Sequence, residues 1–421
     1  MKNMTKKLIR GLIILISGII VAMLLMIFTY LLPTGRITKN VENSTYSFYK
    51  EGTYNRIIAE CENTQLDNFT DAIMLSKAMY VGEENAIEKA VNVYSYRTEK
   101  GSPAEQLIKY CNERDSQDWE KTSYFQYWHG YLIFLKPLLI FLKYYDIRMI
   151  NGCLQMLLVV AIIYLMTKRK LEKFILPFCI ALFVISPITT GMSMQFSSVL
   201  YIFLIAMIVM LLFHEKLKNK YGYFFLIIGM MTSFFDLLTY PVATFGIPII
   251  LFFILENKSL KEGIKDLIIY GLAWIVGYAG MWAGKWILSS ILLKENMFIP
   301  AIEKIMERTG NETINGNFTR LTVLKLNTKM ITNVPNILIT VIYIIYLSIK
   351  AIIQRVKISF KNIKNVLCFI LIATIPIAWY IVAGQHSIIH YWFTYRSLIV
   401  TAFAGLVFIT ILLSKKEIRE E

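Results

Sequence analysis

The chain has 421 residues, of which 56% are hydrophobic and only 17% are charged, and its mean hydropathy is +0.53. Soluble domains carry about a quarter charged residues, so this composition excludes an ordinary soluble enzyme and indicates a membrane protein. The net charge of +15 does not indicate nucleic-acid binding, because the basic residues cluster in short segments between apolar stretches, where they orient a membrane protein.

The chain begins with a basic segment that is followed by an apolar run to Leu32. This run is too long for the apolar core of a signal peptide, and no small-residue cleavage site follows it. We therefore expect an uncleaved first transmembrane helix within residues 1–32. Nine further apolar runs are predicted to span the bilayer. The ten predicted spans lie at about 8–32, 147–167, 174–190, 196–213, 222–235, 240–255, 266–292, 333–352, 365–383 and 393–413.

Lysine and arginine are distributed unequally between the segments that connect the spans. With the N-terminus in the cytoplasm, the inner segments hold 22 of the 44 basic residues, whereas the short outer turns near 189–195, 236–240 and 384–392 hold none. Basic residues concentrate on cytoplasmic loops, so this count predicts a multi-pass protein of the cell membrane with both termini in the cytoplasm. It also argues against a crossing by residues 129–143, which are expected to form an interfacial or re-entrant helix.

These assignments give one membrane domain with an all-α fold and two sizeable extracytoplasmic loops. The first loop comprises residues 33–146 and is expected to form a helical layer on the outer surface. The second loop comprises residues 293–331. The spacing of Cys61 and Cys111, which share the first loop, leaves a disulfide between them open. The remaining segments are 147–292, with transmembrane helices 2–7, and 332–421, with transmembrane helices 8–10 and a cytoplasmic tail.

Residues 66–71 of the first loop read Leu-Asp-Asn-Phe-Thr-Asp, with two carboxylates four residues apart. On a helix, side chains at this spacing share one face. Taken singly, each acid is better explained as a solvated loop residue, and Asp67 also as the cap of a helix that begins near Asn68. The apolar and aromatic neighbours of Asp67 and Asp71 make them the candidate catalytic acids.

Ionisable and aromatic residues also gather at the predicted outer ends of the spans. Such residues are costly inside a bilayer and mark a functional site by default. Lys285 and Arg396 are candidate cations for a donor phosphate, although either side chain could instead extend to the lipid headgroups. Two histidines have the i, i+4 spacing of a metal-ligand pair, but no third ligand is evident. The predicted pocket comprises Asp236, His386, His390, Trp128, His129 and Tyr395.

A carboxylate and cations at a lipid boundary suit a substrate that has a phosphate headgroup and a lipid tail. Arginine binds phosphate in bidentate fashion, and a carboxylate can deprotonate an acceptor hydroxyl for attack on an activated carbon. Transfer of a sugar from a polyprenyl-phosphate donor is the reaction that fits these groups best.

The layout resembles the GT-C superfamily of integral-membrane glycosyltransferases, with an uncleaved first span, a long first outer loop with an early aspartate, and many further spans. Segments 127–130, 235–239 and 390–396 look like motifs of uncharacterised bacterial members. In that family an acid in the loop shortly after the first span is the catalytic base, which implies Asp67, with Asp71 as second candidate. The chain lacks the Asp-Glu pair of some members, which leaves open the choice of base and any role for a divalent cation.

The resemblance implies an inverting enzyme of about ten transmembrane helices that joins a polyprenyl-phosphate sugar to a glycan or lipid-linked acceptor on the extracytoplasmic face. A flippase for lipid-linked oligosaccharides is an alternative, but the ionisable residues favour one face and no inverted repeat is visible. A polysaccharide polymerase or ligase usually has its large outer loop late in the chain. A membrane acyltransferase needs a histidine near an internal acyl donor, whereas three of the four histidines are predicted outside.

Overall fold

The computed structural model describes residues 2–114, 119–256, 258–314, 316–356 and 360–414. Most of these residues are helical, and six stretches among them are long and apolar enough to cross a membrane. The prediction of an all-α membrane protein is thereby confirmed. The six stretches are α1 (Lys2–Tyr30), α8 (Tyr144–Lys168), α11 (Met194–Leu217), α14 (Leu260–Leu293), α17 (Val334–Ile353) and the run of α21 (Tyr391–Thr394), η4 (Tyr395–Leu398) and α22 (Ile399–Leu413).

The other predicted spans coincide with shorter apolar helices. α12 (Tyr221–Phe235) has 15 residues, and its length of about 22 Å falls short of the ~30 Å hydrocarbon core. Two predicted spans are divided where Pro187 or Pro376 follows a helix end, since proline lacks an N–H and disfavours helix at the residue before it. The number of ten crossings stays a prediction. The remaining helices here are α9 (Ile175–Val184), α10 (Pro187–Met192), α13 (Ala243–Glu256), α18 (Phe360–Ala373) and α19 (Ile375–Val382).

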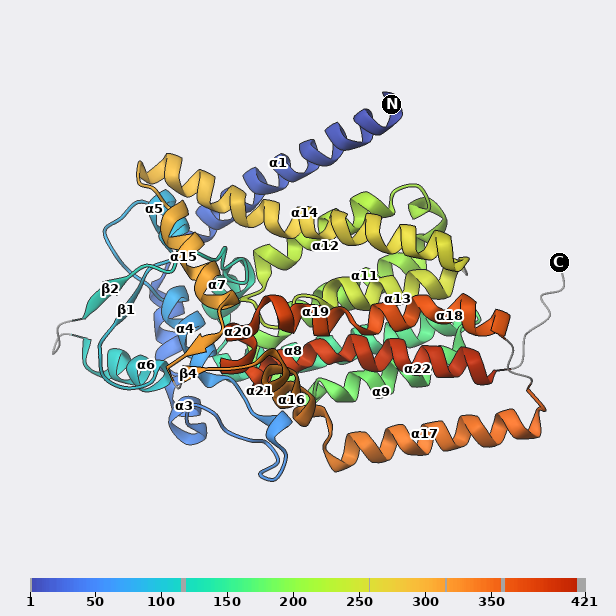
Figure 1. Ribbon diagram of the computed structural model, residues 1–421. Coiled ribbons are helices and arrows are strands. Elements are labelled where there is room, and N and C mark those ends of the chain that lie inside the picture. Colours follow the sequence, from blue (N-terminus) through green and yellow to red (C-terminus); the bar gives the residue numbers. More distant parts are fainter. Residues whose placement is uncertain (1, 115–118, 257, 315, 357–359, 415–421) are drawn as a thin grey trace.

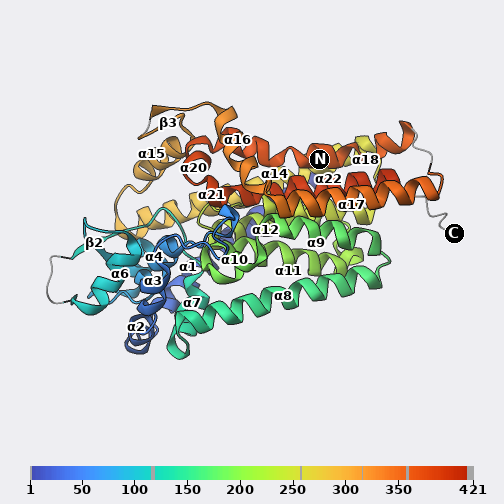
Figure 2. The same cartoon turned by 90° about the horizontal axis from the view of Figure 1, so that it is seen from below.

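The elements of the first loop gather at one end of the long membrane helices (Figures 1 and 2). A capping box shows how the local sequence begins one of them: Ser102 accepts a hydrogen bond from the Glu105 N–H, and the Glu105 carboxylate accepts one from the Ser102 N–H. The predicted interfacial segment 129–143 contains one helix. The elements are α2 (Gly35–Glu42), α3 (Thr45–Glu51), η1 (Glu62–Thr64), α4 (Asn68–Ala78), α5 (Ala86–Asn92), β1 (Ser95–Arg97), α6 (Pro103–Asn112), β2 (Glu120–Thr122) and α7 (Leu132–Phe141).

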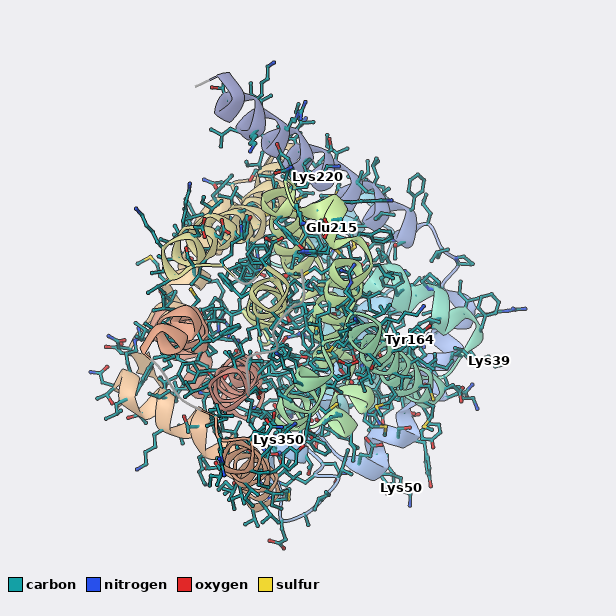
Figure 3. The ribbon with its side chains drawn as sticks, turned by 90° about the vertical axis from the view of Figure 1, so that its right-hand side faces the viewer. Lys39, Lys50, Tyr164, Glu215, Lys220 and Lys350 are labelled. Carbon is teal, nitrogen blue, oxygen red and sulfur yellow. The ribbon has the colours of Figure 1, made fainter. Side chains whose placement is uncertain are left out.

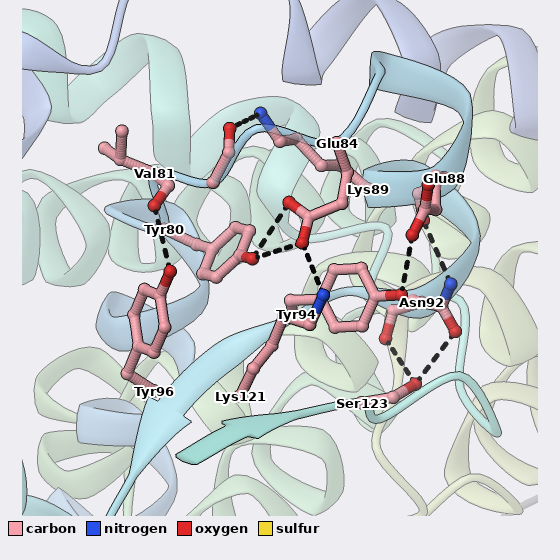
Figure 4. Close-up of polar contacts among 11 residues, drawn as sticks. Tyr80, Val81, Glu84, Glu88, Lys89, Asn92, Tyr94, Tyr96, Lys121 and Ser123 are labelled. Atoms are coloured by element: carbon pink, nitrogen blue, oxygen red, sulfur yellow. Dashed lines mark hydrogen bonds and ion pairs between the residues drawn. The ribbon is translucent and has the colours of Figure 1, made fainter. Parts of the chain in front are cut away.

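A polar network joins the antiparallel pair of β1 and β2 to the neighbouring helices (Figure 4). The Glu84 carboxylate accepts hydrogen bonds from Tyr80 at 2.9 Å and from Lys121 at 2.7 Å. The Tyr94 hydroxyl donates to Glu88 at 3.0 Å. The first loop is therefore internally cross-linked by side chains. The sequence left open a disulfide between Cys61 and Cys111, and the structure shows both as free thiols.

The second loop lies at the same end of the bundle as the first, and the N-terminus and the end of α22 lie at the opposite end (Figure 1). The two loops therefore lie at one end of the bundle, as expected if both are on the same side of the membrane. The predicted cytoplasmic tail after Ser414 lies outside the described residues. The second loop contains α15 (Phe298–Thr309), β3 (Glu312–Thr313), β4 (Gly316–Asn317) and α16 (Arg320–Ile331), while α20 (Gly384–Ile389) follows α19 and η3 (Glu172–Phe174) precedes α9.

The membrane helices approach most closely where glycines allow it. α12 and α14 cross at Gly229 and Gly277, where an added Cβ would lie 2.1 Å from the backbone oxygens of Trp274 and Leu226, respectively. Small residues permit such contact between helix backbones in a membrane. By contrast, α1 and α17 leave most of their apolar side chains exposed, which suits contact with lipid, and α1 lies at the edge of the bundle when it is viewed end-on (Figure 3).

Candidate functional site

The Asp71 side chain is fully buried and anchors the first loop to the membrane helices. Its carboxylate accepts hydrogen bonds from the backbone N–H groups of Met194 (2.9 Å) and Gln195 (3.1 Å) and from the Tyr144 hydroxyl. The first N–H groups of a helix have no partner within the helix, so Asp71 acts as a cap for α11. Burial raises the pKa of Asp71 to about 6, against the opposing effect of Arg148. Asp71 is therefore occupied by structural bonds.

Arg148, which sequence reasoning did not single out, completes this anchor. Its Nη1 donates to both carboxylate oxygens of Glu51 at 2.8 Å, and its Nη2 donates to Asn68 Oδ1 at 2.5 Å. The guanidinium also lies 4.2 Å from the ring centroid of Tyr144. Arg148 lies at the start of a predicted span that follows a loop with acids, and this position could have indicated an ion pair. These contacts fix α3 and α4 on the end of α8.

Asp67 differs from Asp71 because one of its carboxylate oxygens is free. Oδ1 accepts a hydrogen bond from the Thr70 N–H at 3.0 Å, which caps α4, and the Asp67 N–H donates to Ser193 Oγ at 3.0 Å. Oδ2 is buried and has no hydrogen-bond partner in the described part of the chain. Burial, and then the charge of Asp71, raise the pKa of Asp67 to about 7, while Thr70 and Arg396 oppose the rise. This carboxylate is free to accept a proton.

Arg396 is the buried cation whose charge opposes the rise in the pKa of Asp67. Its Nε donates to Ile185 O at 3.2 Å, its Nη2 to Thr189 Oγ1 at 2.9 Å, and its Nη1 to Trp392 O at 3.3 Å. The guanidinium lies 3.8 Å from the ring centroid of Phe196. These bonds use three of the five N–H donors of the guanidinium, so two stay open for an anion. No carboxylate among the described residues forms an ion pair with Arg396.

A cluster of aromatic rings lies near Asp67, whose charge acts on one of them, Tyr54. Tyr54 stacks on Phe69 with a centroid distance of 5.9 Å and meets the ring of Trp392 edge-on at 5.0 Å. Burial and the nearby Asp67 charge raise the pKa of the Tyr54 phenol above its ordinary value. The first loop and the C-terminal segment 390–396 thus meet around Asp67.

Tyr395, predicted as a pocket residue, holds the same two segments together. Its hydroxyl donates to Asn63 O at 3.0 Å, and its side chain is fully buried. Asn63 lies in η1, four residues before Asp67. The contact therefore sets the position of the segment that carries the candidate base.

Lys285 does not join Asp67 and Arg396. Its Nζ donates to Ala90 O at 3.1 Å and to Val91 O at 2.9 Å, and its side chain is fully buried. These carbonyls belong to the last turn of α5, where backbone oxygens lack partners within the helix and a cation is favourable. The structure thus gives Lys285 the role of a helix cap in place of the expected phosphate contact.

Replacing Lys285 by methionine is expected to destabilise the protein by about 1–3 kcal/mol, because two buried carbonyls lose their donor. We expect no loss of affinity for the polyprenyl-phosphate sugar that the sequence predicts as a ligand. Thermal unfolding in detergent and a donor titration would measure the two effects. A weaker donor affinity at unchanged stability would return Lys285 to the phosphate site.

A second group of polar side chains lies around a cavity of about 280 Å³ between α14, α15 and α19, although the cavity surface itself is almost entirely apolar. Four residues that line it each have a buried polar atom for which no hydrogen-bond partner is found in the described part of the chain: Gln126 Oε1, Trp282 Nε1, Arg308 Nε and Trp379 Nε1. Such groups are rarely left unpaired in native interiors. The wall also includes Tyr127, Leu238, Tyr278, Ala279, Trp286, Ala301, Lys304, Ile305, Thr309, Val382 and Ala383.

His386 and His390 lie beside this cavity and hold Arg308. His386 Nε2 lies 2.6 Å from Leu238 O and must donate to it, so Nδ1 accepts a hydrogen bond from Arg308 Nη1 at 2.8 Å. His390 Nε2 lies 3.3 Å from the same Nη1. Burial lowers the pKa of His386 well below its ordinary value and that of His390 to about 3, so both are neutral acceptors. The pair orients an arginine.

Asp236 shapes a turn at the edge of the cavity. Both carboxylate oxygens accept from the Thr239 N–H, at 3.1 and 3.0 Å, and Oδ1 also accepts from the Thr239 hydroxyl. This turn presents Leu238 to the cavity and to His386. Burial raises the pKa of Asp236 to about 7. Asp236 therefore lies close to the second centre.

Trp128 and His129 brace the end of the first loop. Trp128 Nε1 donates to Met281 O at 2.8 Å, which ties the loop to α14. His129 accepts from the Tyr131 hydroxyl at 3.0 Å and donates to Tyr124 O at 2.9 Å, with a positive φ of 55°. Both side chains are buried among these partners and line neither centre.

Most of the predicted site residues therefore form two groups, one around Asp67 and one beside the cavity, while Lys285, Trp128 and His129 belong to neither. Among the described residues, no three His, Cys, Asp or Glu side chains come together as a metal site would require. Comparisons of the chain with family models, with curated proteins and with solved structures find no match. The sequence and the fold define the class, an all-α membrane protein, and its function is argued from the two centres.

Proposed function

We propose that this protein is a membrane glycosyltransferase that moves a sugar from a polyprenyl-phosphate donor to a glycan or lipid-linked acceptor on the extracytoplasmic face. One observation carries the proposal. The Asp67 carboxylate has a free oxygen and a pKa near neutrality, and the buried guanidinium of Arg396, which lacks a carboxylate partner, lies near enough to oppose the rise of that pKa. A base and an anion-binding cation are the two groups that this transfer needs.

In the proposed reaction, Asp67 Oδ2 accepts the proton of the acceptor hydroxyl. The hydroxyl oxygen attacks the anomeric carbon, and the bond from that carbon to the phosphate oxygen breaks with its electron pair on the phosphate. Arg396 stabilises the charge that develops there. Because both side chains are fully buried, the site must open before the substrates enter, a motion of the kind that gates many active sites.

The rate of transfer, measured as kcat/KM, is expected to rise with pH through about 7. Only the deprotonated carboxylate can accept a proton, and the pKa of Asp67 is about 7. The ordinary pKa is 3.8, so the folded protein binds the extra proton between these values and its free energy of unfolding falls as pH rises across that interval. A rate that is flat from pH 5 to 8 would contradict the assignment.

The test is incubation of the purified protein with a panel of polyprenyl-phosphate sugars and an acceptor mixture. The expected result is loss of one donor with release of its lipid phosphate. Reconstituted vesicles separate this outcome from the flippase alternative. Movement of an intact lipid-linked sugar between leaflets, without its consumption, would support the transporter and reject the transferase.

A further inference from the structure

The short helix α10 contacts both Asp67 and Arg396. Ser193 Oγ, at the C-terminal end of α10, accepts a hydrogen bond from the Asp67 N–H at 3.0 Å. Thr189 Oγ1, one turn earlier, accepts a hydrogen bond from Arg396 Nη2 at 2.9 Å. The side chains of all four residues are buried. One short segment therefore carries a contact to the acid and a contact to the cation.

The acid and the cation nevertheless remain apart. Among the described residues no ion pair joins Asp67 to Arg396, although the charge of Arg396 acts on Asp67. Opposite charges attract strongly in a buried environment of low dielectric constant, so the guanidinium must be held in place by other bonds. The Thr189 hydroxyl supplies one of them. It donates its own hydrogen to Ser186 O at 2.7 Å, which leaves its lone pairs to accept from the arginine.

We propose that α10 is a spacer that keeps Arg396 from pairing with Asp67, with Thr189 as the positioning residue for the guanidinium. The spacing between its two contacts is fixed, because the Ser193 N–H donates to Thr189 O at 2.9 Å. An acid and a cation that paired with each other would offer neither a free carboxylate oxygen nor open N–H donors. The role of the spacer in transfer rests on the proposed function, whereas the separation is a property of the protein without substrates.

Two amide side chains of α8 hold α10 in place. Asn151 Nδ2 donates to Gly191 O at 2.8 Å, and Gln155 Nε2 donates to Thr190 O at 3.0 Å. The Thr190 hydroxyl donates back to Gln155 Oε1 at 3.1 Å. An added Cβ at Gly191 would lie 3.0 Å from the Cα of Gly152, so the two backbones are in close contact. Backbone groups in an apolar interior need such partners, and these bonds tie the position of the spacer to α8.

Infrared titration of the Asp67 carboxyl group in the purified full-length protein tests the proposal without any donor. In each variant, the Asp67 signal is the part of the protonated-carboxyl band that the added change Asp67→Asn removes. In the unaltered protein its midpoint is expected at about pH 7. Thr189→Val removes the hydroxyl with little change in shape and frees Arg396 Nη2 to donate to the Asp67 carboxylate. The midpoint should then fall by about one pH unit or more. Thr189→Ser keeps the hydroxyl and should keep the original midpoint.

Two further variants separate positioning from general stability. Gln155→Met removes the bonds that this amide makes with Thr190, and it should also lower the midpoint. Thr410→Val removes a comparable buried hydrogen bond, to the Tyr343 hydroxyl at 2.8 Å, near the end of α22. This control should leave the midpoint unchanged even if the protein unfolds at a lower temperature.

An unchanged midpoint in Thr189→Val would reject the proposal, and so would an equal fall in Thr410→Val. If Thr189→Val fails to fold, Gln155→Met decides, with a lower midpoint in favour and an unchanged one against. The result is separate from the proposed reaction. A lowered midpoint in a protein that consumes no donor would support the spacer and reject the transferase, whereas sugar transfer with an unchanged midpoint in Thr189→Val would reject the spacer alone.

Discussion

Asp67→Asn is expected to abolish sugar transfer, with a loss of about 10²–10⁴-fold or more in rate, because a general base contributes on that order. The fold should survive, since asparagine caps a helix as well as aspartate does and can keep the hydrogen bond from the Thr70 N–H. The raised pKa of Asp67 also means that its ionised form is unfavourable in the folded protein. Loss of the charge should therefore not reduce stability at pH 8.

Donor consumption and thermal unfolding, measured on the same preparation, test this prediction. Thr70→Ala is a useful comparison, because it keeps the backbone hydrogen bond to Asp67 and removes the Thr70 hydroxyl, which lowers the pKa of Asp67. Full transfer activity in the Asp67 variant would remove Asp67 as the base. Loss of activity together with a large drop in the unfolding temperature would leave only a structural role.

Asp71→Ala is expected to cause the largest loss of stability, about 3–5 kcal/mol, because it leaves three buried donors without their acceptor and removes a negative charge that interacts with Arg148. The three donors are the N–H groups of Met194 and Gln195 and the hydroxyl of Tyr144. The N-terminus of α11 would lose its cap, and the first loop would lose a contact with the bundle. Thermal unfolding in detergent measures the effect.

Glu99→Ala removes an exposed acid from the same loop and should change stability by no more than about 0.5 kcal/mol. Asp71→Asn, which keeps one acceptor oxygen, should fall between the two. If Asp71→Ala were as stable as the Glu99 variant, the anchor would contribute little, and Asp71 would return as a candidate base.

The general layout could be predicted from the sequence because it depends on local properties. Apolar runs predict helices in a membrane, and basic residues predict which segments share a side. Pro187 and Pro376 indicated that two predicted spans are divided. Each span was nevertheless predicted as one helix, because its apolar run is long. The pair of strands in the first loop had no clear pattern, since each has only three residues.

The choice between Asp67 and Asp71 could not be made from the sequence. It depends on which acid receives the first N–H groups of α11, which lie 123 and 124 residues further along the chain. Nothing near residues 66–71 indicates that distance. Only the folded chain distinguishes an acid with three donors from one with a free oxygen.

The cations illustrate a different difficulty. Lys285 was selected because it interrupts an apolar run, yet its charge is used within the protein by the end of α5. Arg308 was not selected, because it lies in a mixed polar segment that resembles a solvated surface. Its spacing from Ala301 and Lys304 places all three on one helix face, and this periodicity was the signal that could have found it.

The contact between Tyr395 and Asn63 joins residues 332 positions apart, and it has a consequence for biogenesis. The first loop is synthesised long before the last apolar stretch, so residues 62–71 lack some of their final contacts during synthesis. Their final environment also requires Ser193. Chains truncated before residue 391 should therefore insert their early helices but leave residues 62–71 sensitive to proteases. This segment should become protected only in chains that include the last apolar stretch.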